Sequence, residues 1–242
     1  MRLTAICPIL GEGFHAEVEK EAAAWIPPDV ELEVRSVEYG VESIESEYDE
    51  VLCSPPILEQ IEAAAADGTD GVFVSCFADP GVAAARERVD VPVVGGFEPS
   101  VLTALSLGDR VGIVTVLPNV VPTIRAAIRR HGLAERCASV RVVDIPVLGL
   151  TDRAEMLNRL HDQARAAVDA GEVDVIVLGC TGMSGAAAEL QDRLPASGPA
   201  VPVLDPTGAA IGWLLHLARL GVSSSRTTYL PPPDKKRTRP GG

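Results

Sequence analysis

Two cysteines occupy equivalent places in two similar stretches of the chain. Cys76 ends the apolar run 72–76, and Cys180 ends the apolar run 175–180. A turn of small residues and an alanine-rich helical pattern follow each cysteine. Each run is typical of a buried parallel strand, because strands covered on both faces are almost continuously apolar. Each thiol is therefore predicted at the carboxyl end of a strand, where open α/β sheets bind ligands.

This matched pair of thiols predicts proton-transfer chemistry. A thiolate can remove a proton from one face of a bound carbon while a thiol delivers a proton to the other face. The configuration of the substrate decides which sulfur acts as base and which as acid, and the result is racemisation. The unpaired N–H groups and the dipole of the helix after each cysteine are expected to favour the thiolate. Cys76 or Cys180 alone would be interpreted as an ordinary buried cysteine, so the hypothesis depends on the repetition.

The residues around the thiols are candidates for holding a carboxylate or an enolate oxygen. Small polar residues and backbone N–H groups can form such an anion site, although the same residue types also serve simply as turn formers. A further candidate, Thr115, is predicted at the same end of the second half's first strand. The candidates nearest the cysteines are Ser75, Phe77, Thr181, Gly182 and the hydroxyl of Ser184.

The order of predicted elements occurs twice. The first half is expected to contain strands over 3–7, 31–37, 72–76 and 91–95 and helices over 11–25, 56–67, 80–88 and 99–107. The second half is expected to contain strands over 110–116, 139–143, 175–180 and 201–205 and helices over 119–130, 153–170, 184–194 and 207–219. An acidic loop is expected over 39–50, long enough to be functional.

Three landmarks support this repetition. The first strands of the halves are 108 residues apart, the two cysteines 104, and the two Val-Pro-Val segments 110. The sequence predicts an α/β fold with two similar parallel-sheet lobes related by a pseudo-two-fold axis. Residues 1–108 form the first lobe, carrying Cys76, 109–221 form the second, carrying Cys180, and 222–242 form a disordered tail. Valine-rich strands recur in any α/β chain, but that does not explain the matched spacings.

Composition restricts the class of protein. The chain has a formal net charge of −13, which disfavours nucleic acid and anionic membranes as partners. The five scattered cysteines show neither a disulfide framework nor metal-ligand spacing. No apolar run has the length of a signal peptide or a membrane span, so a cytoplasmic protein is expected. Lysine occurs only at positions 20, 235 and 236, which disfavours a pyridoxal Schiff base. We expect no cofactor and no metal.

A rival hypothesis comes from residues 11–16. Their sequence, GEGFHA, matches the G-x-G-x-x-A form of the dinucleotide-binding fingerprint after a first strand. The match is weak, because three residues separate the strand from the glycines and the chain is short for a dehydrogenase. A nucleotide-binding domain is therefore the less favoured interpretation.

The chain resembles the Asp/Glu/hydantoin racemase superfamily, in particular its hydantoin racemase branch. The resemblance spans nearly the whole chain apart from the tail, and it is carried by residues 43–50, 76–81, 85–87, 91–95, 178–183 and 201–205. It implies a two-lobed α/β fold, a cleft between the lobes, no cofactor, and Cys76 and Cys180 as the catalytic pair. It also implies substrate contacts from Ser43, Ile44 and Thr115.

One departure from the family concerns the segment after the first strand. The family usually has Asn-Pro-Asn there, whereas this chain has Cys7-Pro8-Ile9. Pro8 remains a candidate substrate contact, but an amide that would help to hold substrate is missing.

The expected function is a cofactor-independent racemase acting on a carbon next to a carbonyl, with 5-substituted hydantoins as the favoured small-molecule substrates. Racemisation of aspartate, glutamate or allantoin, isomerisation of maleate and decarboxylation of arylmalonates are alternatives. A non-catalytic binding protein is the alternative outside enzymes. We also expect a homo-oligomer.

Overall fold

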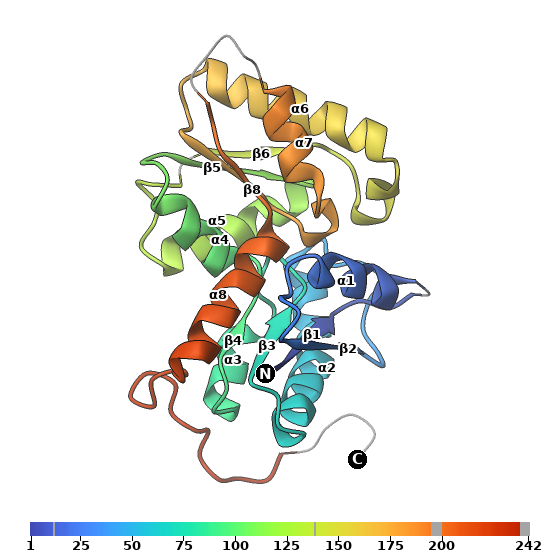
Figure 1. Ribbon diagram of the computed structural model, residues 1–242, viewed down its shortest axis with the longest axis vertical. Coiled ribbons are helices and arrows are strands. Elements are labelled where there is room, and N and C mark those ends of the chain that lie inside the picture. Colours follow the sequence, from blue (N-terminus) through green and yellow to red (C-terminus); the bar gives the residue numbers. More distant parts are fainter. Residues whose placement is uncertain (12, 138, 195–199, 238–242) are drawn as a thin grey trace.

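Two four-stranded parallel sheets form the centre of the structure, a computed structural model (Figure 1). It describes residues 1–11, 13–137, 139–194 and 200–237 of the 242-residue chain. The first sheet has the order β2-β1-β3-β4 and consists of β1 (Arg2–Cys7), β2 (Glu31–Ser36), β3 (Gly71–Val74) and β4 (Val93–Val94). The second has the equivalent order β6-β5-β7-β8 and consists of β5 (Val111–Thr115), β6 (Ser139–Val142), β7 (Val175–Leu178) and β8 (Val203–Leu204). The predicted α/β fold with two parallel-sheet lobes is confirmed.

Helices cover both sheets and bury the Val, Ile, Leu and Ala side chains of the strands, as expected for parallel sheets. The α-helices are α1 (Phe14–Ala23), α2 (Glu47–Ala66), α3 (Val82–Arg88), α4 (Phe97–Leu105), α5 (Val121–Arg130), α6 (Arg153–Asp169), α7 (Ala186–Arg193) and α8 (Pro206–Leu220). Three 3₁₀ turns lie at η1 (Pro118–Val120), η2 (Val147–Thr151) and η3 (Thr181–Met183).

Helix α2 begins nine residues earlier than the sequence predicted. The sequence predicts its start at about Pro56, but both Pro55 and Pro56 lie inside the helix. Ser46 provides the actual N-cap, since its hydroxyl accepts a hydrogen bond from the Asp49 N–H at 3.2 Å. The acidic side chains of the first turn also complement the positive end of the helix dipole. The predicted acidic loop over 39–50 therefore ends at Ser46.

The last helix of each half packs on the sheet of the other half. Helix α8 follows β8, yet its residues Ile211 and Leu214 share a buried cluster with Phe73 of β3. Helix α4 follows β4, yet Val101 lies in a buried cluster with Val177 of β7. Figure 1 shows α8 running along the first sheet and α4 beside α5 in the second lobe. The two lobes are therefore joined by exchanged helices as well as by loops.

The segment after α8 lies against α3. Residues 222–237 contain no helix or strand. Arg226 nevertheless donates hydrogen bonds to the Asp90 carboxylate at 2.9 Å and to the Arg86 carbonyl at 2.8 Å. Arg86 in turn donates to the Tyr229 hydroxyl at 3.2 Å. These contacts lie in the first part of the tail that the sequence predicted to be disordered, and disorder over 222–242 stays a prediction.

Replacement of Arg226 by alanine tests whether these contacts hold in solution. Hydrogen bonds that involve a charged group contribute about 1.5–3 kcal/mol each, less when exposed. We expect the Arg226→Ala variant to unfold at a temperature roughly 2–4 °C lower for each kcal/mol lost. Circular dichroism on heating measures this, with Lys236→Ala as the control. Identical melting temperatures of Arg226→Ala and wild type would show that residues 222–237 are not held against α3 in solution.

Candidate active site

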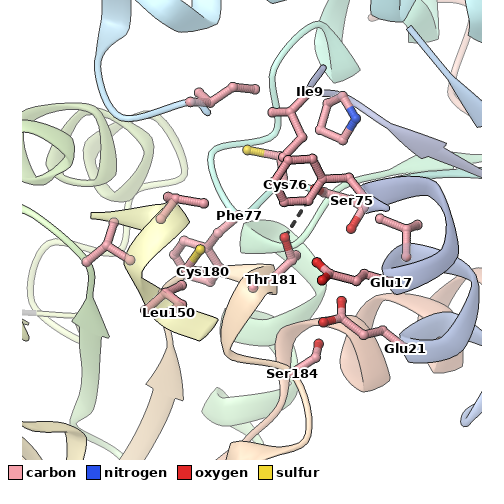
Figure 2. A pocket seen from close by; sticks show the side chains of 18 of the residues that line it. Ile9, Glu17, Glu21, Ser75, Cys76, Phe77, Leu150, Cys180, Thr181 and Ser184 are labelled. Atoms are coloured by element: carbon pink, nitrogen blue, oxygen red, sulfur yellow. Dashed lines mark hydrogen bonds between the residues drawn. The ribbon is translucent and has the colours of Figure 1, made fainter. Parts of the chain in front are cut away.

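A cavity of about 640 Å³ is formed by both lobes and contains both cysteines. Cys76 lies two residues after β3 and Cys180 two residues after β7, so each thiol lies beyond the carboxyl end of an inner strand of its sheet. Both side chains are partly buried. Figure 2 shows them in the same pocket, approaching from different lobes. Parallel pairing with β1 and β5 fixes the positions of both strands.

Most of the predicted site residues line this cavity. They are Pro8, Ile44, Ser75, Phe77, Thr115, Thr181 and Gly182, together with Ser184. Ser43 is the exception, because the cavity wall includes its neighbour Ile44 but not Ser43. Ser43 as a substrate contact stays a prediction.

The predicted hydroxyl donors are already engaged with the protein. Thr115 is fully buried and donates a hydrogen bond to the Gly179 carbonyl at 2.9 Å. Thr181 donates to the Ser75 carbonyl at 3.1 Å, a bond that joins the two cysteine loops (Figure 2). Ser184 contacts the Thr207 hydroxyl at 2.7 Å. These hydroxyls therefore donate their protons within the protein and shape the cavity.

Backbone N–H groups also approach the two sulfurs in the same way. The Ala78 N–H lowers the pKa of the Cys76 thiol, and the Gly182 N–H lowers the pKa of the Cys180 thiol. In both loops the donor is the second residue after the cysteine. The local geometry of the two thiols is thus repeated between the lobes.

Burial, however, outweighs these donors in setting the thiol pKa values. Loss of solvent raises the pKa of Cys76 well above its ordinary value, while the Ala78 N–H lowers it and the Cys180 charge raises it. Burial likewise raises the pKa of Cys180 to about 12, with the Gly182 N–H lowering it. The expectation that the thiolate is favoured is therefore wrong for the free protein. Helices α3 and α7 begin only after Gly81 and Gly185, so their N-termini are separated from the thiols by four residues.

Two acidic side chains of the cavity wall were not singled out from the sequence. Glu17 and Glu21 lie one turn apart on α1 and point into the pocket (Figure 2). Burial, together with the charges of Asp205 and Glu17, raises the pKa of Glu21 to about 8. Their four-residue spacing in the sequence could have indicated these two residues, because it places both carboxylates on one face of a helix.

A second contact between the lobes closes one side of the site. Glu45, next to Ile44 in the loop before α2, accepts a hydrogen bond from the Val147 N–H of η2 at 2.6 Å. Both Ile44 and Val147 line the cavity. The loop of the first lobe is therefore fixed against the second lobe beside the cysteines.

Within the residues that the structure describes, there is no group of three or more His, Cys, Asp or Glu side chains arranged to hold a metal ion. Among the same residues, no helix combines the length and the apolar character needed to cross a membrane.

Comparison with known proteins identifies the family. The Asp/Glu/Hydantoin racemase family model matches residues 11–213, so the chain belongs to this family. It is a racemase, an isomerase, and this assignment replaces the dinucleotide-binding hypothesis for residues 11–16.

Individual relatives agree with this assignment. A hydantoin racemase from Pseudomonas sp. (strain NS671) is 31% identical over 237 residues, covering 98% of this chain and 93% of the relative. One from Rhizobium meliloti is 37% identical over 194 residues, covering 78% of each chain. The solved allantoin racemase from Klebsiella pneumoniae superposes with a TM-score of 0.90 at 31% identity, covering 99% of this chain and 96% of that one.

Proposed function

We propose that this chain is a cofactor-independent racemase of 5-substituted hydantoins in which Cys76 and Cys180 form the acid–base pair. The observation that carries the proposal is the matched placement of the two thiols. Each lies beyond an inner strand of its sheet, the N–H of the second residue after it lowers its pKa, and both line one cavity.

The proposed reaction uses the two thiols in opposite protonation states. One sulfur, as thiolate, takes the proton from C5 of the hydantoin ring, and the electron pair of the broken C–H bond moves onto the adjacent carbonyl as an enolate. Backbone N–H groups of the cysteine loops stabilise the enolate oxygen. The other sulfur, as thiol, returns a proton to the opposite face of C5. The two thiols have then exchanged protonation states, and the reverse reaction starts from the opposite enantiomer.

A thiolate is only a modest base, so a carbon whose anion is delocalised is the suitable substrate. In a hydantoin the anion at C5 spreads into the neighbouring carbonyl, whereas the carboxylate of a free amino acid resists further negative charge. Allantoin is itself a hydantoin with a ureido group at C5. The names of the hydantoin and allantoin racemases among the relatives support this substrate class.

The wall opposite the acidic residues favours an uncharged substituent. Ile9 lines the cavity where the family usually provides an asparagine, and Phe77 and Leu150 add further apolar surface. We infer that the C5 substituent lies against these side chains, and that replacement of the amide shifts selectivity toward apolar substituents.

A direct test follows a single enantiomer of 5-benzylhydantoin by optical rotation. The protein is first dialysed exhaustively with a chelator. We expect the rotation to decay to zero much faster than in buffer alone. Retained rotation would contradict the substrate assignment. Activity lost on dialysis and restored by a metal ion, or a spectrum of bound pyridoxal or flavin, would contradict cofactor independence.

The pH dependence tests the state of the thiols. Because burial raises both thiol pKa values, the thiolate fraction is small at neutral pH and grows as pH rises. Well below a pKa this fraction increases about tenfold per pH unit. We expect kcat/KM to rise steeply between about pH 6.5 and 8.5, after subtraction of spontaneous racemisation at each pH. A flat profile over this range would mean that the thiolate is already populated at neutral pH.

A further inference from the structure

Asp79 joins the Cys76 loop to the start of α4. Its carboxylate accepts hydrogen bonds from the Phe97 N–H at 2.9 Å and the Glu98 N–H at 3.2 Å, which are orphan donors of the first turn. The Cys76 carbonyl accepts a third bond from the Gly96 N–H at 2.9 Å. Asp79 itself has a φ of 56°, a conformation that Asp tolerates better than most residues. The loop is therefore held in one unusual conformation against this helix.

The approach between loop and helix is close enough to require glycine. A Cβ at Gly95 would lie 2.2 Å from the Asp79 carboxylate oxygen Oδ1. A Cβ at Gly96 would lie 3.0 Å from the Phe77 Cα. The start of α4 is thus fitted directly onto the residues that follow Cys76.

Asp205 makes the equivalent connection in the second lobe. It is 7% exposed and caps α8, accepting hydrogen bonds from the Thr207 N–H at 2.9 Å and the Gly208 N–H at 3.1 Å. Its other oxygen accepts from the Gly185 N–H at 2.7 Å, and Gly185 belongs to the Cys180 loop. In the first lobe the carboxylate belongs to the cysteine loop, and in the second lobe it belongs to the start of the helix. In both lobes it connects the cysteine loop with the helix.

Both helices concerned are the exchanged ones. Helix α4 packs on the second sheet and α8 packs on the first, and the two helices also pack against each other. Each cysteine loop is therefore bound to a helix whose side chains are buried in the opposite lobe. The position of each sulfur consequently depends on how the two lobes are docked.

We propose that Asp79 and Asp205 are positioning residues for the proton transfer, each holding the thiol of its own lobe at the reacting distance from a carbon bound between the lobes. This inference rests on the proposed two-cysteine function. Neither carboxylate is among the residues that line the cavity, so both act through the loops. A displacement of about 1 Å in a catalytic group can lower a rate by roughly 10²-fold.

The test uses Asp79→Asn and Asp205→Asn in the full chain, with single enantiomers of a hydantoin in D₂O. An asparagine oxygen still accepts a hydrogen bond, but its NH₂ group cannot replace the second oxygen. We expect kcat to fall by about 10- to 100-fold with KM changed less than about threefold. Asp79→Asn should resemble Cys76→Ser in the enantiomer that gains solvent deuterium without inverting. Asp205→Asn should resemble Cys180→Ser and favour the opposite enantiomer.

Matched controls lie at the other ends of the same strands. Asp70 precedes β3 and accepts a hydrogen bond from the Arg2 N–H at 2.7 Å, and Asp174 precedes β7 and accepts from the Arg110 N–H at 2.9 Å. Asp70→Asn and Asp174→Asn also replace one oxygen of a carboxylate that accepts a backbone hydrogen bond, but they do so far from the thiols. They should leave kcat and the exchange pattern as in wild type. Thermal unfolding of all four variants identifies any that do not fold.

The possible outcomes separate this inference from the proposed function. If Cys76→Ser and Cys180→Ser exchange opposite enantiomers while the Asp79 and Asp205 variants lose activity without any enantiomer preference, positioning is wrong and the two-cysteine mechanism stands. Wild-type kcat in either aspartate variant would also overturn the positioning role. If the two cysteine variants exchange the same enantiomer, the proposed function itself fails.

Discussion

Replacing either Cys76 or Cys180 with serine is expected to abolish nearly all racemisation. A serine hydroxyl ionises far above the thiol's ordinary pKa of roughly 8.5, so it can neither accept nor deliver the proton at a useful rate. A positioned acid or base typically contributes about 10²–10⁴-fold, and each single variant should lose at least that much. The double variant should lose little more than either single one, because racemisation requires both groups in one turnover.

Initial rates of optical-rotation change with one hydantoin enantiomer measure this effect. Cys137→Ala is the matched control, because Cys137 is buried between α5 and the second sheet and does not line the cavity. It should keep the wild-type kcat even if it melts earlier. A Cys76→Ser or Cys180→Ser protein that racemises at the wild-type rate would refute the pair.

Discrimination against acidic amino acids is the second large effect expected. A substrate carboxylate bound beside Glu17 meets a like charge, and a pair of unit charges about 5 Å apart costs roughly 3 kcal/mol at an effective dielectric constant of about 20. This corresponds to a factor of about 10² in kcat/KM, since 1.36 kcal/mol is a factor of ten. Glu21, whose pKa is raised to about 8, adds a second such charge only as pH rises through that value. We therefore expect 5-substituted hydantoins to exceed aspartate and glutamate by at least about 10²-fold in kcat/KM.

Neutralising Glu17 and Glu21 should reduce the difference in kcat/KM between hydantoins and acidic amino acids. In a Glu17→Gln/Glu21→Gln protein, kcat/KM for aspartate should rise relative to that for an uncharged hydantoin. Glu19→Gln is the control, because Glu19 lies on the same helix but outside the cavity wall. A wild-type protein with a higher kcat/KM on either amino acid than on hydantoins would reverse the substrate assignment. An unchanged ratio in the double variant would show that the two glutamates do not face the substrate.

The repeated lobes were predictable because their signal is local. Valine-rich runs such as 72–76 and 175–180 indicate buried parallel strands, and matched spacings indicate two similar halves. The exchange of α4 and α8 was not predictable in the same way. An apolar helix face shows that the helix is buried, but not which of two similar sheets covers it. The start of α2 was mispredicted because the cap at Ser46 was weaker as a signal than the Pro55-Pro56 pair.

The candidate site, too, could be predicted from the sequence only in part. The thiols could be found because a strand end and a helix start lie within a few residues of each in sequence. Their raised pKa values could not, because the burial that causes them comes from both lobes. Ser43 and Ile44 were carried over together from family resemblance, and Ile44 lines the cavity. The Asp79 connection depends on a helix start 18 residues later in the chain.

The most direct measurement of the two-base mechanism is hydrogen exchange by the cysteine variants in D₂O. A variant with one intact thiol can still remove and return the C5 proton on one face, so it exchanges that proton without inverting the carbon. Incubation of Cys76→Ser and Cys180→Ser with each pure hydantoin enantiomer, followed by mass spectrometry of the recovered substrate, gives four rates. We predict that Cys76→Ser exchanges one enantiomer and Cys180→Ser the other. Exchange of the same enantiomer by both variants would contradict the assignment of the two thiols to opposite faces of one carbon.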